Sequence, residues 1–194
     1  MSAFTEKKGV GSVKSKVMLA VLMMGALSVQ AQMENASFEV EGSSGDQAES
    51  WSRWGDWMNR ESGWTPVKEG SCIIGYHHWQ IEKGDNSGLY QDMKVTAGKN
   101  YTFSIYANAD NPADGKNAES VELRLETTVN GTQATVASKT FSLADIATGT
   151  DWSRLQVSGV APNDTLRVLV VVNPAKEGPR GGAVKFDAAD IDAR

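Results

Sequence analysis

The chain has 194 residues, a formal net charge of −5 and a single cysteine. The first 31 residues contribute +3, from four Lys and one Glu, so the rest of the chain carries −8. No Lys/Arg cluster follows the N-terminal region, which excludes a nucleic-acid-binding protein, because such proteins need cationic contacts to the phosphates. The single cysteine, Cys72, excludes an intrachain disulfide and a cysteine-based zinc site.

The first 31 residues have the pattern of a secretory signal peptide. Four Lys residues form a basic n-region, and the apolar run 17–29 (VMLAVLMMGALSV) follows as the h-region. Val29 and Ala31 supply the small residues that signal peptidase reads, so we predict cleavage after Ala31 and a domain over 32–194. The apolar run is shorter than the roughly 17 to 25 residues that cross a bilayer. We therefore expect a protein without a membrane span, secreted to the periplasm or the extracellular space.

From residue 87 onward, the sequence predicts short β-strands separated by turn residues. Apolar and polar residues alternate within each run, and Gly, Asn, Asp or Pro ends most of them. The predicted strands are 89–95, 101–107, 121–129, 135–141, 153–160, 165–172 and 183–191, with a single helical turn at 143–147. Strands at this spacing predict an all-β sandwich of two sheets.

The alternation assigns side chains to the two sides of each strand. The predicted core side holds Tyr101, Phe103, Ile105, Val121, Leu123 and Leu125. Tyr106 then lies on an outer face, and Glu122, Arg124 and Glu126 form an outer row. That row is either a set of solvated cross-strand charge pairs or the polar floor of a ligand site.

Five of the six tryptophans lie in one segment, at Trp51, Trp54, Trp57, Trp64 and Trp79. A small core rarely takes five indoles from one segment, because each buried N–H needs a partner, so we expect some of them at the surface. Exposed aromatic faces beside polar side chains suit a sugar ring, whose C–H groups stack on them while its hydroxyls form hydrogen bonds. We expect Trp51 and Trp64 to pack under a long loop and Trp152 to close the edge of the core.

Five short motifs together resemble a known family. They are 35–39 (NASFE), 89–92 (LYQD), 95–103 (VTAGKNYTF), 151–152 (DW) and 184–187 (VKFD). In order and spacing they resemble the carbohydrate-binding module superfamily that includes families 4, 9, 16 and 22. The resemblance covers about residues 33–191 and implies a galactose-binding-like jelly-roll fold with two antiparallel sheets.

The resemblance also implies a structural calcium ion and a glycan groove. The family's calcium carboxylates map onto Glu39 and Asp187, while Ala188 stands where many members have a second Asp. Calcium takes six to eight oxygen ligands, so carbonyls and water would complete the site. The residues that the resemblance assigns to the carbohydrate-binding groove are Trp54, Trp57, Trp79, Tyr106, Glu122, Arg124 and Gln91. Gln91 alternates with the core residues of its own strand.

We therefore expect a secreted, non-catalytic protein that binds a polysaccharide or oligosaccharide. Charges between residues 51 and 90 nearly balance, which favours a neutral glycan. Family members usually accompany a glycoside hydrolase, so a secreted enzyme assembly is an expected partner. Two alternatives stay open. One is a jelly-roll polysaccharide lyase that uses a Tyr, a His and an Arg. The candidates are Tyr76, either His77 or His78, and Arg124. The other is an adhesive surface protein whose Trp-rich segment contacts another protein.

Overall fold

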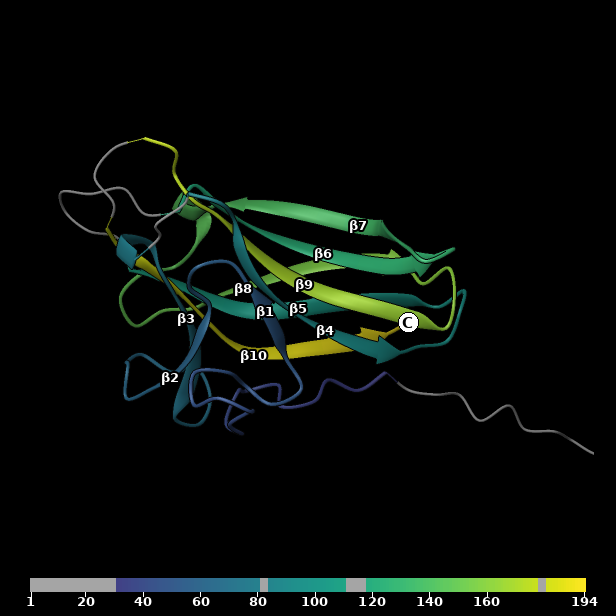
Figure 1. Ribbon diagram of the computed structural model, residues 1–194, viewed down its shortest axis with the longest axis horizontal. Coiled ribbons are helices and arrows are strands. Elements are labelled where there is room, and N and C mark those ends of the chain that lie inside the picture. The colour runs from purple at the N-terminus through teal and green to yellow at the C-terminus, as the bar shows by residue number, and fades with distance from the viewer. Residues whose placement is uncertain (1–30, 81–83, 111–117, 178–180) are drawn as a thin grey trace, which may run out of the picture.

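The computed structural model describes residues 31–80, 84–110, 118–177 and 181–194 (Figure 1). The predicted signal peptide lies outside these residues except for Ala31. Within the described ranges, no helix combines the length and apolar character that crossing a membrane requires.

The described residues form two antiparallel five-stranded sheets that face each other (Figure 1). The first sheet has the order β1 (Ser52–Trp54), β4 (Ser87–Lys94), β9 (Thr165–Asn173), β6 (Ser120–Val129) and β7 (Thr132–Ser142). The second sheet has the order β2 (Asn59–Ser62), β3 (Cys72–His77), β10 (Ala183–Ala193), β5 (Asn100–Asp110) and β8 (Ser153–Val160). Two short 3₁₀ turns, η1 (His78–Gln80) and η2 (Leu143–Asp145), complete the elements.

The predicted all-β sandwich is confirmed, and each of the seven predicted strands corresponds to one of β4 to β10. The sequence missed β1, β2 and β3, which lie in the segment that we expected to form a long loop. The first two have only three and four residues, too few to show an alternation. Every residue of β3 is buried, so its sequence CIIGYH lacks the polar positions that mark a half-exposed strand.

The core lies between the two sheets and follows the predicted alternation. The six predicted core residues of β5 and β6 are at most 1% exposed. Trp51 packs at the N-terminal side of this core, with its ring 5.3 Å from that of Phe38, and its Nε1 donates to the carbonyls of Glu34 and Asn35. Its predicted packing role is confirmed. Cys72 is buried and has no disulfide.

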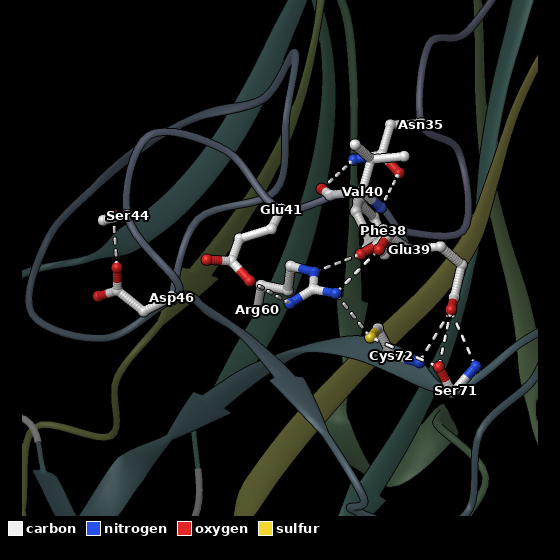
Figure 2. Close-up of polar contacts among 10 residues, drawn as sticks. All are labelled: Asn35, Phe38, Glu39, Val40, Glu41, Ser44, Asp46, Arg60, Ser71 and Cys72. Atoms are coloured by element: carbon white, nitrogen blue, oxygen red, sulfur yellow. Dashed lines mark hydrogen bonds and ion pairs between the residues drawn. The ribbon is translucent and has the colours of Figure 1, made fainter.

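Arg60 on β2 ties the N-terminal segment to the second sheet (Figure 2). Its Nε and Nη2 each donate to a backbone carbonyl over 2.8 Å, those of Phe38 and Glu39. Nη2 also lies 3.0 Å from Sγ of Cys72, the first residue of β3. One guanidinium thus joins the chain before β1 to two strands of the second sheet.

Loops cover part of the outer face of the second sheet. Ser104 and Asn108, which alternate outward with Tyr106, are only 2% and 1% exposed. Asn108 Nδ2 donates to the carbonyls of Gly149 and Asp151, which brings that loop across the sheet. Nζ of Lys68 lies 4.4 Å from the centre of the Tyr106 ring. Tyr106 is therefore a partly covered ring rather than an open platform.

Candidate functional site

The outer face of the first sheet carries three rows of side chains that run across its strands. The strand register sets the first row as Trp54, Gly88, Val171, Glu122 and Thr140. The second row is Ser52, Tyr90, Leu169, Arg124 and Ser138. The third row is Asp92, Arg167, Glu126 and Thr135. We call this surface the first-sheet face.

Trp54 lies over a glycine at one edge of the first-sheet face. A Cβ atom at Gly88 would lie 2.2 Å from Cη2 of Trp54, so only a glycine allows the indole to approach the sheet this closely. Trp54 Nε1 donates to Oδ1 of Asn86 over 3.1 Å. The ring remains partly exposed. These contacts hold the indole in one position while leaving part of its surface open to a ligand.

Tyr90 and Arg167 form the middle of the first-sheet face. The Tyr90 ring centre lies 6.2 Å from that of Trp54, and the Arg167 guanidinium carbon lies 3.9 Å from the Tyr90 ring centre. Arg167 also donates from Nε and Nη2 to both carboxylate oxygens of Asp92, each over 2.7 Å. The hydrogen bond to Asp92 is the largest of the effects that raise the pKa of Arg167. The guanidinium is therefore a permanent cation in a fixed orientation.

Arg124 forms a second bidentate pair on the neighbouring strand. Its Nε and Nη2 donate to the two oxygens of Glu122 over 2.7 and 2.8 Å, and Nη1 lies 3.7 Å from Glu126. The hydrogen bond to Glu122 is the main cause of the raised pKa of Arg124. Between the charged pairs, Leu169 and Val171 point outward yet are 6% and 0% exposed. These two apolar side chains are covered by their neighbours, and the charges around them already have partners.

A hollow of about 400 Å³ continues the first-sheet face beyond Arg167. Its lining consists of Asp92, Met93, Lys94, Thr127, Thr128, Gln133, Thr165, Leu166 and Arg167. Most of these side chains offer a hydroxyl, amide or charged group to a ligand. Because Asp92 and Arg167 line the hollow and also belong to the third row, the hollow and the face share a border.

A second aromatic group lies on the second sheet. Trp57, Trp64 and Trp79 surround His77, the last residue of β3, and we call these four residues the indole–histidine cluster. The Trp64 ring stacks on the imidazole at 4.6 Å, while Trp57 and Trp79 meet it edge-on at 5.3 and 4.5 Å. His77 Nε2 lies 2.5 Å from Oε1 of Glu61.

The structure divides the predicted binding residues between two sheets. Trp54, Glu122 and Arg124 come together on the first-sheet face. Trp57 and Trp79 belong to the indole–histidine cluster. Tyr106 lies on β5 of the second sheet, beneath Lys68.

Gln91 requires a correction, because it is 4% exposed and does not belong to a ligand-facing surface. Its side chain accepts from the backbone amide of Glu34 and donates to the carbonyls of Glu34 and Ser50. Gln91 therefore anchors the N-terminal segment. Its alternation with core residues was the signal for this role.

Sequence reasoning missed Tyr90 and Arg167 as members of the site. Tyr90 lies between Leu89 and Gln91, whose side chains point to the other side of the strand, and it belongs to a motif used for the family resemblance. Nothing in the sequence showed that Arg167 lies over Tyr90, since the two residues are 77 positions apart and meet only through the pairing of β4 with β9. Trp64, expected to pack under a loop, stacks on His77 and remains partly exposed.

The residues of the lyase alternative do not converge. Tyr76 is fully buried, and its hydroxyl lies 2.9 Å from Nδ1 of His78. His77 faces the indole–histidine cluster on the second sheet, whereas Arg124 lies on the outer face of the first sheet.

Glu39 and Asp187 both bind the segment 68–72 through backbone amides. Glu39 accepts hydrogen bonds from the amides of Ser71 and Cys72 and from the Ser71 hydroxyl (Figure 2). Asp187 accepts from the amides of Lys68, Glu69 and Ala188 over 2.7 to 2.9 Å.

These contacts show whether Glu39 and Asp187 could coordinate the calcium ion that the family resemblance implies. Amide N–H groups repel a cation, and among the described residues no group of three or more His, Cys, Asp or Glu is placed to hold a metal. The donor set around Glu39 and Asp187 therefore does not fit calcium. Melting curves with and without a chelator test whether calcium nevertheless binds at this position.

No protein-family model matches the sequence, and no curated protein matches it either. Solved structures do match. The carbohydrate-binding module TmCBM61, determined with β-1,4-galactotriose, is 14% identical with a TM-score of 0.53, over 85% of this chain and 99% of that one. The CBM22-1 xylan-binding domain from Paenibacillus barcinonensis is 14% identical with a TM-score of 0.52, over 84% and 92%. A cyclase from Fischerella sp. TAU is 17% identical with a TM-score of 0.60, over 85% and 98%. The chain therefore has the jelly-roll β-sandwich fold of carbohydrate-binding modules, a fold that it also shares with a cyclase.

Proposed function

We propose that the protein is a secreted, non-catalytic binder of a neutral polysaccharide and that the first-sheet face is its binding site. The observation that carries the proposal is the position of Trp54. Its partly exposed indole is fixed over Gly88 and shares the first-sheet face with two oriented arginine–carboxylate pairs. A sugar ring requires this combination, because it has an apolar C–H face and a rim of hydroxyls.

The charge balance of the face favours a neutral ligand. Asp92, Glu122 and Glu126 stand beside Arg167 and Arg124, so the face carries about one net negative charge and both guanidiniums already have carboxylate partners. A uronate would have to displace one of these carboxylates. A hydroxyl needs no such exchange, because it donates to a carboxylate oxygen and accepts from a remaining guanidinium N–H.

The dimensions of the face favour a chain of sugars over a single sugar. Gly88 and Asp92 are four residues apart on β4, which corresponds to about 13 Å at roughly 3.3 Å per residue. The hollow begins at Asp92. A ligand that contacts both Trp54 and the hollow is therefore an oligosaccharide or a segment of a polysaccharide.

Two solved structures of this fold support the ligand class by their descriptions, one determined with β-1,4-galactotriose and the other named a xylan-binding domain. Because polysaccharides of this kind lie outside the cytoplasm, the predicted signal peptide agrees with the proposed function. A secreted glycoside hydrolase is the partner that such a binder would assist.

The test is affinity gel electrophoresis of the protein without its signal peptide. Native gels would contain β-1,4-galactan, xylan, β-glucan, mannan or, as anionic ligands, pectate and alginate. We expect one or more neutral polymers to retard the protein. We also expect Trp54→Ala to bind the same polymer at least tenfold more weakly than wild type, which is equivalent to about 1.4 kcal/mol. Val160→Ala is the matched control, because Val160 is 54% exposed on β8 of the second sheet. Retardation by no polymer, or equal retardation of Trp54→Ala, would contradict the proposal. Release of unsaturated products from pectate or alginate would instead support a lyase.

A further inference from the structure

The indole–histidine cluster lies outside the first-sheet face and has the features of a built site. Trp79 is 49% exposed, among the most exposed of the large apolar side chains in the described part of the chain. Its ring meets the His77 imidazole edge-on at 4.5 Å with an interplanar angle of 90°. An exposed indole that is braced in this way presents its surface with little loss of side-chain freedom on binding.

Glu61 and Trp64, which hold His77 beneath Trp79, can reach it only because residue 75 is a glycine. Glu61 reaches His77 by crossing over Gly75 on β3, where a Cβ atom would lie 2.7 Å from Oε1 of Glu61 and 2.8 Å from Cζ3 of Trp64. The Trp57 Nε1 also donates to Oε1 of Glu61, over 3.4 Å. The lack of a side chain at Gly75 therefore admits both the carboxylate and the Trp64 ring that hold His77.

His77 retains one nitrogen without a hydrogen-bond partner. Its Nε2 contacts Glu61, whereas Nδ1 is buried and has no partner among the described residues. Leaving a buried polar atom unsatisfied costs about 1 to 3 kcal/mol. Because Nδ1 has almost no exposed surface, a ligand hydroxyl can donate to it only after a small movement of the surrounding rings; that hydrogen bond would recover part of this cost.

The charge of the cluster matches a neutral ligand. Lys185 on β10 places Nζ 4.5 Å from the centre of the Trp64 ring and donates to the carbonyl of Thr65 over 2.7 Å. Two carboxylates, Asp110 and Glu61, act on Lys185, so the cluster has no excess of positive charge that would attract an anionic ligand. Burial lowers the pKa of Lys185.

We propose that the indole–histidine cluster is a second sugar-binding site, in which Trp79 stacks on a neutral sugar ring and His77 Nδ1 accepts a hydrogen bond from one of its hydroxyls. The ligand class rests on the proposed function, but the site does not, because it uses different residues on the other sheet. The two sites flank one edge of the sandwich, since β1 and β2 are edge strands of their sheets and are joined only by residues 55–58.

Titration calorimetry counts the two sites separately. The probe is a trisaccharide of whichever neutral polymer retards the protein, and Trp54→Ala and Trp79→Ala serve as controls for each other. We expect two trisaccharides per wild-type protein, one for each single variant and none for the double variant. A single wild-type site that persists in Trp79→Ala and vanishes in Trp54→Ala would overturn the second site and leave the proposed function intact. A single site with the opposite pattern would place binding at the cluster and overturn the first-sheet face.

The role of His77 is tested by His77→Phe, which keeps a ring for Trp64 and Trp79 to contact but removes both Nδ1 and the Nε2 contact with Glu61. In a Trp54→Ala background, we expect the affinity of the remaining site to fall about tenfold, the value of one hydrogen bond of about 1.4 kcal/mol. An unchanged near-ultraviolet circular dichroism spectrum would show that the cluster still folds. Unchanged affinity in a folded variant would remove His77 from the site. As an independent readout, the wild-type protein should cross-link and precipitate the long polymer, whereas folded Trp79→Ala should not.

Discussion

Removal of the Arg60 guanidinium tests how the N-terminal segment is attached to the sandwich. Arg60→Ala deletes two 2.8 Å hydrogen bonds to the carbonyls of Phe38 and Glu39 and the contact with Cys72. The Arg60 side chain is only 13% exposed, so the carbonyls would regain little solvent contact. At the lower end of the roughly 1.5 to 3 kcal/mol that each hydrogen bond to a charged group contributes, the two bonds give an expected loss of about 3 kcal/mol.

The assay is urea unfolding followed by tryptophan fluorescence. With a slope of about 2 kcal/mol per molar urea, the loss corresponds to a midpoint that is lower by about 1.5 M. Arg53→Ala is the matched control, because Arg53 pairs with Asp46 in a position where the two side chains are 31% and 45% exposed. Such exposed pairs contribute about 0 to 1 kcal/mol. If Arg60→Ala costs no more than Arg53→Ala, the guanidinium does not anchor the segment and the reasoning is refuted.

Three further predictions concern glycines, metal and pH. Gly88→Ala should destabilise more than Gly75→Ala in urea unfolding, because the Cβ at Gly88 would lie 2.5 Å from a backbone oxygen of β9, whereas at Gly75 the nearest atoms belong to side chains; equal losses would contradict this. Neither EDTA nor added calcium should shift the melting temperature, since amides occupy the carboxylates of Glu39 and Asp187; a drop in EDTA would support the calcium prediction instead. Burial alone would raise the pKa of Glu39, but the hydrogen bonds from Ser71 and Cys72 outweigh burial, and the pKa is lowered. Glu39 therefore stabilises the fold above its unfolded pKa, and this stabilisation is lost as the pH falls through the folded pKa. Burial raises the pKa of Asp187, so its contribution is present at acid pH and lost as pH rises through its folded pKa. Melting temperatures between pH 3 and 7 should therefore fall less on the acid side for Glu39→Gln than for wild type; identical pH profiles would refute the Glu39 assignment.

The sequence was most informative where strands are long and half exposed. In β5 and β6, each second residue enters the core, so Phe103 and Leu123 could be placed from alternation alone. The same rule placed Glu122 and Arg124 on an outer face. It failed for β3, where both sides are covered and alternation disappears.

The composition of the site was harder to predict than the fold. Strand periodicity gives the side of a sheet on which a residue lies, but not which sheet. The family resemblance assigned Trp54 and Trp57 to one groove, although Trp54 lies on β1 of the first sheet and Trp57, in the connection after β1, contacts His77 of the second sheet. Loops that cross a sheet are equally invisible to periodicity, and Tyr106 beneath Lys68 is an example. Long-range pairing alone brings Arg167 over Tyr90.

The central claim is that the fixed, partly exposed indole of Trp54 binds a neutral glycan on the first-sheet face. The most direct measurement is the dissociation constant of the retarding polymer's trisaccharide for Trp54→Ala in a Trp79→Ala background, compared with Trp79→Ala alone. The account predicts affinity at least tenfold weaker when Trp54 is removed, in proteins with the same melting temperature. Equal affinities for the two folded proteins would contradict it.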